Sequence, residues 1–235
     1  MNMKALFHIH TRYSPDALLS PAKALKYAQD NGFDVLAVTD HDTLAGAREA
    51  EKLNKSSRLS IITGAEYSTE KGHIIGLFLK DDILPGNSVD VISAIKSQGG
   101  LVVLPHPVRL KEVDDELMRH VDIVEGHNCR VDSAGNRFAM ELARAYDKPV
   151  LLGNDAHFAG ELKLGAVEFH NRYDDPRKTI LKAQRTLHVK SSSHHYKQIS
   201  GFIHSYRQYG LYIAFMREFM EKITKFLPKP TGSGK

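Results

Sequence analysis

The sequence contains a single cysteine, no tryptophan and no long apolar run. Cys129 has no second cysteine to pair with, so an intrachain disulfide is excluded, which is typical of a protein of the reducing cytosol. No stretch approaches the roughly 20 apolar residues that a membrane-spanning helix requires. His8 and His10 interrupt the early apolar segment, which argues against a signal peptide. We therefore expect a cytoplasmic protein with no membrane partner.

Charge and composition restrict the class of protein further. Of the 235 residues, 42% are hydrophobic and 26% are charged, which is typical of one large folded domain. The net charge of +4 suits an anionic substrate such as a phosphate, and it equally suits solubility alone. The sequence has neither an aromatic and basic sheet face nor a helix-turn-helix pattern. Long nucleic acid is therefore not the expected partner.

Short apolar strands alternate with helices along most of the chain. Strands are expected at 4–10, 35–39, 59–63, 73–79, 101–104, 121–125 and 150–152, with weaker ones at 164–169 and 187–189. Helices are expected at 22–31, 44–55, 89–98, 134–146 and 176–184. The alternation predicts a mostly parallel sheet, closed or nearly closed into an α/β barrel of about seven or eight strands. The short turn before the 73–79 strand predicts that this strand runs antiparallel to its predecessor.

The end of the chain differs in pattern from the rest. Residues 1–196 hold the alternating elements, 197–227 read as a helical extension, and 228–235 as a flexible Gly, Ser and Pro-containing tail. Apolar residues recur at helical spacing in the extension, as one helix or as two broken near Gly210. We favour a helix packed on the barrel, and next a homodimer contact. A membrane-surface helix is least favoured, because the polar face carries both signs of charge.

Residues that can bind metal ions recur where the predicted strands begin or end. His8 and His10 lie two positions apart on the first strand, but such a pair alone is more often incidental. Six histidines and three carboxylates share this placement: His8, His10, Asp16, His41, Glu66, His73, His106, Asp155 and His157. Strand ends on one face of a parallel barrel converge, so these groups are expected to meet. Without cations they would repel one another or stay unsatisfied.

These positions carry motifs that resemble those of the polymerase and histidinol phosphatase (PHP) family. The motifs are His8-Ile9-His10-Thr11, Ser14-Pro15-Asp16, Thr39-Asp40-His41-Asp42, Gly64-Ala65-Glu66, His106-Pro107 and Asn154-Asp155-Ala156-His157, in the family's order. The resemblance covers roughly residues 3–169, and Asn154 stands where the family often has Ser. It implies a distorted, TIM-barrel-like (β/α)7 barrel with two or three divalent ions, Zn, Mn or Fe. It also implies hydrolysis of phosphoesters.

The resemblance further divides the metal ligands into three sets. One ion would be held by His8, His10, Glu66 and Asp155, a second by Glu66, His73 and His106, and a third by Asp16, His41 and His157. Imidazoles and carboxylates without thiolates suit such ions better than a structural zinc site. A hydroxide between closely spaced metals would be the nucleophile, with Asp16 and His41 among the catalytic residues. Asp40 and Asp42 flank His41 and could orient imidazoles, although Asp40 could equally be a structural cap.

Candidate substrate-binding residues follow other strand ends. Arg12, Arg109 and Arg130 are predicted to contact phosphate through their guanidinium groups, although each alone could be an ordinary loop arginine. Asn128 ends the sixth strand and is placed with them, and the neighbouring His127 is a candidate to protonate the leaving oxygen. These five residues form the predicted substrate side of the site.

The expected function is hydrolysis of a small phosphomonoester or a nucleotide phosphate. Few residues separate the barrel elements, so the cleft is expected to be open. Alternatives within the same class are a histidinol-phosphate phosphatase and a 5′-to-3′ exonuclease acting on short oligonucleotides. From another class, the chain could be a metal-binding regulatory module without activity, although such a module has no reason to keep all nine ligands. Hydrolysis of a C–N bond is a further alternative, but no lysine stands at a strand end to be carboxylated.

Overall fold

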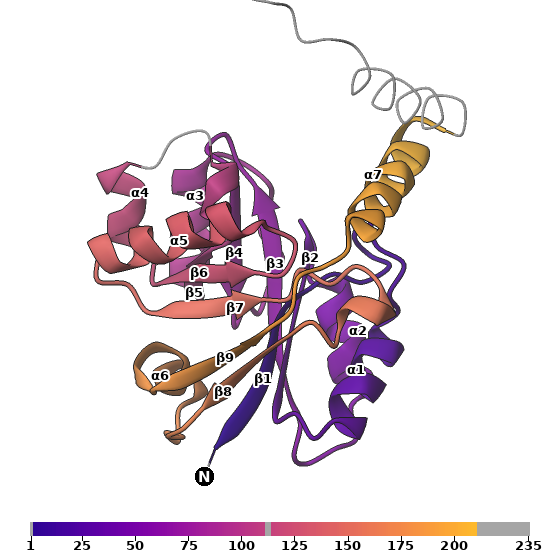
Figure 1. The fold of residues 1–235 in the computed structure, drawn as a ribbon, viewed down its shortest axis with the longest axis horizontal. Coiled ribbons are helices and arrows are strands. Elements are labelled where there is room, and N and C mark those ends of the chain that lie inside the picture. Colours follow the sequence, from indigo (N-terminus) through magenta and orange to yellow (C-terminus); the bar gives the residue numbers. More distant parts are fainter. Residues whose placement is uncertain (1, 111–113, 211–235) are drawn as a thin grey trace, which may run out of the picture.

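The strands form one continuous sheet in a computed structural model that describes residues 2–110 and 114–210. The sheet has nine strands in the order β7-β6-β5-β4-β3-β2-β1-β8-β9 (Figure 1). Their bounds are β1 (Met3–Ile9), β2 (Val35–His41), β3 (Ser60–Ser68), β4 (His73–Leu77), β5 (Leu101–Leu104), β6 (Ile123–Asn128), β7 (Val150–Gly153), β8 (Gly165–Phe169) and β9 (Arg185–Val189). All strands expected from the sequence are present.

Strand direction follows the length of each connection. β1, β2 and β3 are parallel to one another, as are β5, β6 and β7, and helical crossovers join most of these strands. β4 runs antiparallel to β3 and β5, as the short turn before it predicted. β8 and β9 form an antiparallel hairpin connected through α6, and β8 pairs antiparallel with β1. The sheet is therefore mixed rather than uniformly parallel.

The sheet closes at one end only, along the free edge of β1. Near the start of β1, Met3 pairs with Phe169 of β8. Further along, Asn154 N donates to Phe7 O (2.9 Å) and His10 N donates to Ala156 O (2.9 Å), which joins β1 to the segment after β7. The result is a mixed α/β barrel that is nearly closed, so the predicted fold class is confirmed. We call the end closed by the β1–β7 contact the mouth.

Helices cover the outside of the barrel. They are α1 (Pro21–Asp30), α2 (Ala45–Leu53), α3 (Ser88–Ser97), α4 (Asp115–His120), α5 (Ser133–Ala145), α6 (Pro176–Lys182) and α7 (His194–Tyr209). α1 and α2 pack on one side, while α3, α4 and α5 pack on another (Figure 1). α4 was not expected, because its six residues are too few to show a helical period. Within the described residues, no helix is long and apolar enough to cross a membrane.

Part of the predicted C-terminal extension is visible as α7. This helix begins three residues before the expected boundary at 197 and ends at Gly210, which adopts a φ of 83°. The break near Gly210 thus coincides with a left-handed glycine, a common way to end a helix. Residues 211–227 of the extension and the tail at 228–235 lie outside the described residues, as does any homodimer contact they would make.

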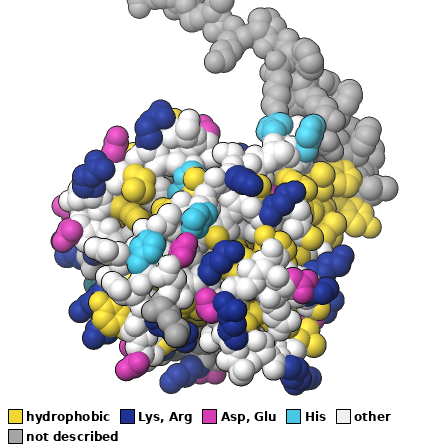
Figure 2. Space-filling view, turned by 60° about the horizontal axis from the view of Figure 1, so that its bottom comes forward, with side chains coloured by type: hydrophobic (Ala, Val, Ile, Leu, Met, Phe, Trp, Pro, Cys, Tyr) yellow, Lys and Arg dark blue, Asp and Glu magenta, His cyan; other side chains and the backbone are white. Residues whose placement is uncertain are grey.

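Apolar side chains fill the barrel below its mouth. Phe7, Val103, Ile123 and Leu151 are buried there, and Ile180 of α6 belongs to the same cluster. Because this cluster fills the interior, polar groups inside the barrel are confined to the mouth. On the outer surface, Figure 2 shows basic and acidic side chains interspersed over one face, with no single basic stripe.

Arg185 links the β8–β9 hairpin to the barrel through backbone carbonyl groups. Its guanidinium donates to Val150 O (3.0 Å) and Ile180 O (2.7 Å), and lies 5.1 Å from the ring centre of Phe169. Burial lowers the pKa of Arg185 to about 10. This side chain thereby satisfies backbone carbonyls where the barrel is not closed by strand pairing.

Replacing Arg185 by Met should destabilise the fold without affecting the mouth. The carbonyls it satisfies would lose their donor, and we expect a loss of about 1–3 kcal/mol in the free energy of unfolding. Urea denaturation measures this, with Arg172→Met, at an exposed arginine, as control. An unchanged midpoint for Arg185→Met would contradict this account of the hairpin.

Candidate metal centre

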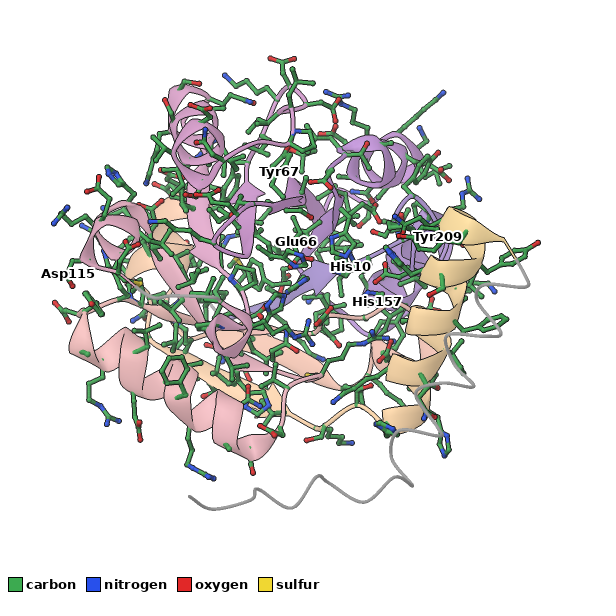
Figure 3. All side chains as sticks on the ribbon, turned by 90° about the horizontal axis from the view of Figure 1, so that it is seen from above. His10, Glu66, Tyr67, Asp115, His157 and Tyr209 are labelled. Atoms are coloured by element: carbon green, nitrogen blue, oxygen red, sulfur yellow. The ribbon has the colours of Figure 1, made fainter. Side chains whose placement is uncertain are left out.

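All nine predicted donor residues lie at the mouth of the barrel, where they form one cluster. They come from β1 and the loop after it, from the ends of β2 and β3, from the start of β4, and from the segments after β5 and β7. Figure 3 shows His10, Glu66 and His157 directed toward the middle of the ring of strands. Four groups of three donors have ligand atoms within 4.8 Å of one another. The convergence expected from the sequence is therefore observed.

A β-bulge at His8 directs both histidines of β1 inward. Leu6 pairs with Leu36 and Ile9 with Val38, so β1 holds one extra residue between these pairs. His8 absorbs it with a left-handed φ of 60°. Met3, Ala5 and Phe7 already point into the barrel, so simple alternation would have turned His8 and His10 outward. The bulge shifts the phase by one residue and brings both imidazoles inside.

The His8 set consists of His8, His10, Glu66 and Asp155. The Nε2 atoms of His8 and His10 lie 3.0 Å apart, and Glu66 Oε2 lies 3.3 Å and 3.2 Å from them. Asp155 Oδ1 lies 3.7 Å from the first nitrogen and 3.5 Å from the second. Two nitrogens and two oxygens from buried side chains therefore face a common point.

The His106 set uses the other oxygen of Glu66. Glu66 Oε1 lies 2.9 Å from His73 Nδ1 and 2.9 Å from His106 Nε2. Since Oε2 belongs to the His8 set, the two oxygens of one buried carboxylate face two neighbouring donor sets. This is the placement that a carboxylate bridging two cations requires.

The Asp16 set lies on the other side of His10. Asp16 Oδ2 lies 2.9 Å from His157 Nε2 and 3.7 Å from His41 Nε2. Asp16 Oδ1 is buried and has no hydrogen-bond partner among the described residues. The ring centres of His10 and His157 are 4.3 Å apart, so this set adjoins the His8 set.

Hydrogen bonds on the far side of three imidazoles turn their lone pairs toward the centre. His157 Nδ1 lies 2.9 Å from Asp155 O, a pure acceptor, so Nδ1 carries the proton. His8 Nδ1 likewise faces Glu125 Oε1 at 2.7 Å. Ser14 Oγ donates to Asp40 and therefore accepts from His10 Nδ1 at 3.1 Å. Each Nε2 then faces other acceptors, an arrangement that a cation would satisfy.

Burial and charge displace the pKa values of these groups strongly. Burial, together with the nearby His157 and His41, lowers the pKa of His10 to about 3. For His8 burial also acts downward, but the charges of Glu125, Glu66 and Asp155 prevail and raise its pKa well above the ordinary value. For Glu66, burial acts upward, but the surrounding histidines hold its pKa well below the ordinary value. The centre is thus a set of mutually dependent charges.

Glu125 supports the His8 and His106 sets and was not identified as a site residue from the sequence. Besides contacting His8 Nδ1, it accepts from His106 N (2.9 Å) and from Asn128 Nδ2 (2.8 Å) through Oε2. A Cβ atom at Gly153 would lie 1.5 Å from Glu125 Oε1, so this glycine leaves the space that the carboxylate occupies. The signal in the sequence was a lone carboxylate at the end of a buried strand.

Ser14 and Asp40 fix the turn that carries Asp16. Asp40 accepts from Thr11 N (2.5 Å), Thr11 Oγ1 (2.7 Å) and Ser14 Oγ (2.7 Å). Asp40 therefore caps the local backbone, and through the Ser14 hydroxyl it also helps to orient the imidazole of His10 rather than that of His41. Asp42 accepts from Ser68 N (3.0 Å) instead of orienting an imidazole.

A second bulge separates His127 and Asn128 from their predicted roles. β6 is irregular between Glu125 and His127, which shifts the alternation there. His127 Nε2 consequently lies 3.5 Å from Asn136 Nδ2 of α5, and burial lowers its pKa. The structure gives it no contact with the donor cluster, so a role as leaving-group acid has no support here. Asn128 points inward and donates to Glu125 and Asp155 (3.2 Å), which makes it a support for ligands rather than a substrate contact.

The three predicted phosphate-binding arginines have different environments. Arg12 donates to Glu49 of α2 (2.7 Å). Arg130 is buried and paired with Glu161, so its guanidinium is not free for substrate and this prediction is corrected. Arg109 is 48% exposed at the mouth, with Nη1 3.8 Å from Asp155 Oδ2. Of the three, Arg109 is the one placed to contact an anion bound at the donor cluster.

Fold and site together define a barrel protein with a candidate multinuclear metal centre. The family model for the PHP domain matches residues 7–228. The chain belongs to this family. The resemblance seen in the sequence motifs is therefore confirmed.

Related chains were found in two microorganisms. Two uncharacterized proteins of Methanocaldococcus jannaschii are similar to this chain. One is 31% identical over 180 residues, which is 71% of this chain and 70% of that protein. The other is 44% identical over 116 residues, which is 45% of this chain and 68% of that protein. A Haemophilus influenzae protein named 5′-3′ exoribonuclease is 43% identical over 81 residues, which is 33% of this chain and only 29% of that protein.

Solved structures share the fold at low sequence identity. A two-domain protein from Bacteroides vulgatus, described as containing a predicted PHP-like metal-dependent phosphoesterase, has a TM-score of 0.67 at 16% identity. The match covers 80% of this chain and 65% of that one. A protein from Bifidobacterium adolescentis, described as a putative metal-dependent phosphoesterase, has a TM-score of 0.54 at 17% identity. The match covers 66% of this chain and 88% of that one.

Replacing Glu125 by Gln should weaken metal binding while conserving size. The new amide would place an NH2 group against His8 Nδ1 or against the donors His106 N and Asn128 Nδ2. We expect the affinity for divalent ions to fall about 10- to 100-fold, as for other supports of ligands. Mn²⁺ titration by calorimetry measures this, with Glu168→Gln, on β8 away from the mouth, as control. Equal affinities for the wild type and Glu125→Gln would refute the role of Glu125.

The metal-free protein should lose stability as pH rises from 6.5 to 9. Burial acts to lower the pKa of His41, but Glu66 and Asp16 raise it from 6.5 to about 9. Protonated His41 therefore stabilises the fold fully below pH 6.5, and this contribution disappears as pH passes 9. His8 acts in the same direction. Bound metal replaces the protons, so it should remove the alkaline loss.

Thermal unfolding across this pH range, with EDTA or with Mn²⁺, tests the linkage. The expected result is a melting temperature that falls with pH in EDTA and changes less with Mn²⁺. A melting temperature in EDTA that is constant between pH 6.5 and 9 would show that these charges do not couple to folding.

Proposed function

We propose that this protein is a metal-dependent phosphoesterase with three divalent ions at the mouth of its barrel. The observation that carries the proposal is the gathering of nine donor residues at the mouth, with the two oxygens of Glu66 facing different donors. We divide these donors into three adjoining sets, two of which share the carboxylate of Glu66. The donors are imidazoles and carboxylates, which suit Zn, Mn or Fe. Membership of a family whose structural neighbours are described as metal-dependent phosphoesterases supports the same reaction class.

Each part of the cluster has a role in this proposal. Bound divalent ions would supply Lewis acidity toward a phosphate and a nucleophilic water at neutral pH. Glu66 would contribute one oxygen to each of two ions, because its two oxygens face different donor sets. Glu125, Ser14 and the carbonyl of Asp155 keep the imidazole lone pairs directed inward. Asp16, His41 and His73 are partly exposed, so this part of the cluster is open to a substrate.

Cationic side chains at the mouth would bind the phosphate. Arg109 lies beside Asp155 and is half exposed, so its guanidinium can contact oxygens of a phosphate held at the cluster. Lys197 of α7 lies near the same charges: burial lowers its pKa, and the positive charges of Arg109 and Arg130 lower it further. An anionic substrate would relieve this concentration of positive charge.

The proposed substrate is a small phosphomonoester or a nucleotide phosphate. A second candidate is the 5′ end of a short RNA, because a relative carries the name 5′-3′ exoribonuclease. Matched substrates separate the two: metal-loaded protein is incubated with phosphomonoesters, histidinol phosphate, nucleoside bisphosphates and short 5′-phosphorylated RNA. Release of phosphate from small esters supports the first candidate, and stepwise release of nucleotides supports the second. No hydrolysis of any of these with Mn²⁺, Zn²⁺ or Fe²⁺ would overturn the phosphoesterase proposal.

Removing one ligand should abolish most activity together with at least one ion. His10→Ala and Asp155→Ala each delete a donor of the His8 set, and His10 also adjoins the Asp16 set. We expect at least one equivalent of metal to be lost, with turnover reduced at least about 100-fold. Elemental analysis and phosphate release measure the two effects, with His170→Ala on the far side of β8 as control. Full occupancy with wild-type turnover would exclude these ligand assignments.

A further inference from the structure

Helix α7 lies against the mouth of the barrel and contacts two of its loops. Tyr196 stacks on Phe158, with ring centres 5.4 Å apart and planes 22° apart. One turn further along, Ser200 Oγ accepts from Arg130 Nη2 at 3.0 Å. Near the end of the helix, Arg207 Nη1 donates to Ser14 O at 2.6 Å. Figure 3 shows α7 beside the opening toward which His10 and His157 are directed.

The first loop contact leads to a buried ion pair. Arg130 Nε and Nη2 donate to the two oxygens of Glu161 at 2.9 Å and 2.8 Å. Arg130 is 6% exposed and Glu161 is fully buried. Glu161 also accepts from Ser192 Oγ at 2.5 Å. A buried charge pair persists only when both partners are satisfied, and Ser200 and Ser192 provide the remaining contacts.

The same carboxylate holds the backbone of a proposed metal ligand. Glu161 Oε2 accepts from His157 N at 2.9 Å, and His157 belongs to the Asp16 set. A continuous series of contacts therefore runs from Ser200 of α7 through Arg130 and Glu161 to His157. The second loop contact reaches the same set, because Ser14 Oγ accepts from His41 N at 3.0 Å.

The other two sets are held from inside the barrel. Glu125 of β6 contacts His8 Nδ1, His106 N and Asn128 Nδ2, which belong to barrel strands or to the segment after β5. Metal ligands at the two sides of the mouth thus have different buried carboxylates as supports, and Ser14, which accepts from His10 Nδ1 as well as from His41 N, joins the two sides. Glu125 belongs to the barrel, whereas Glu161 depends on Arg130 and through it on α7.

We propose that Arg130, Glu161 and Ser200 are positioning residues through which α7 sets the geometry of the Asp16 set. This inference rests on the proposed function, since it assumes that the Asp16 set binds an ion. Loss of the contacts among Ser200, Arg130 and Glu161 should weaken the binding of this ion and leave the binding of ions at the His8 and His106 sets unchanged. α7 is then a part of the metal centre although none of its residues is a ligand.

Two variants test the inference by counting metal ions. Ser200→Ala removes one contact to Arg130 with little change in volume, and Arg130→Lys keeps the charge but cannot form the two parallel bonds to Glu161. Mn²⁺ binding is followed by calorimetry and by elemental analysis after dialysis. We expect one of three equivalents to bind about tenfold more weakly in each variant, with the other two unchanged. The thermal unfolding of each variant is measured alongside.

Arg185→Lys is the matched control, because Arg185 is a partly buried arginine that contacts carbonyls remote from the mouth. It should lower the melting temperature and leave all three equivalents unchanged. Unchanged metal binding in both test variants would overturn the inference. So would an equal loss of affinity at all three equivalents, in the control and in the test variants alike. If the wild type binds at most two ions, the three-ion proposal itself fails. If Arg130→Lys does not fold, Ser200→Ala alone decides.

Discussion

The bulge at His8 is the constraint on which the mouth of the barrel depends. Because of the bulge, three side chains at the end of β1 point inward: Phe7 into the apolar interior, and His8 and His10 into the cluster. Ile9, between the two histidines, packs outside the barrel. A left-handed φ is costly for a residue with a side chain and persists where surrounding contacts enforce it. His106 and Asp155 share this conformation, at φ of 28° and 52°. Their surroundings include the β1–β7 contact, where Ala156 N donates to His8 O (3.3 Å). Closure of the barrel and geometry of the site are therefore one feature.

The sequence was sufficient to predict which residues would meet, because convergence of strand ends depends only on the alternation of strands and helices. It was not sufficient to predict which side chains at those ends would face the centre. Alternation alone would have turned His8 outward, and the irregularity after Glu125 turned His127 toward α5 and Asn128 inward. Such bulges depend on the register between strands distant in sequence. At His8 the family motif identified the residue as a metal ligand in spite of the bulge. No motif covers His127, so its orientation could not be predicted.

Arg109 and Arg130 show the same limit for charged side chains. Both follow strand ends and look alike in the sequence. Arg130 is buried because Glu161, 31 residues further along the chain, meets it with both oxygens, whereas Arg109 has only a 3.8 Å approach to Asp155 and stays half exposed. Pairing with a partner distant in sequence decides whether an arginine is structural or free for an anion. Neither composition nor local spacing contains that information.

Burial of acidic residues explains how the two sides of the mouth differ. Glu125 and Glu161 are both buried carboxylates that hold metal-ligand segments, but Glu125 is neutralised by histidine and backbone donors within the barrel, while Glu161 requires the guanidinium of Arg130. Because that guanidinium requires Ser200 in turn, the charge balance of the Asp16 side extends to a helix outside the barrel. In the inference drawn above, a change at α7 therefore reaches His157 through the hydrogen bonds around this ion pair rather than through a long-range movement. Since a buried ion pair is favourable only when its remaining donors and acceptors are satisfied, a displacement of α7 has a route to this one set of ligands.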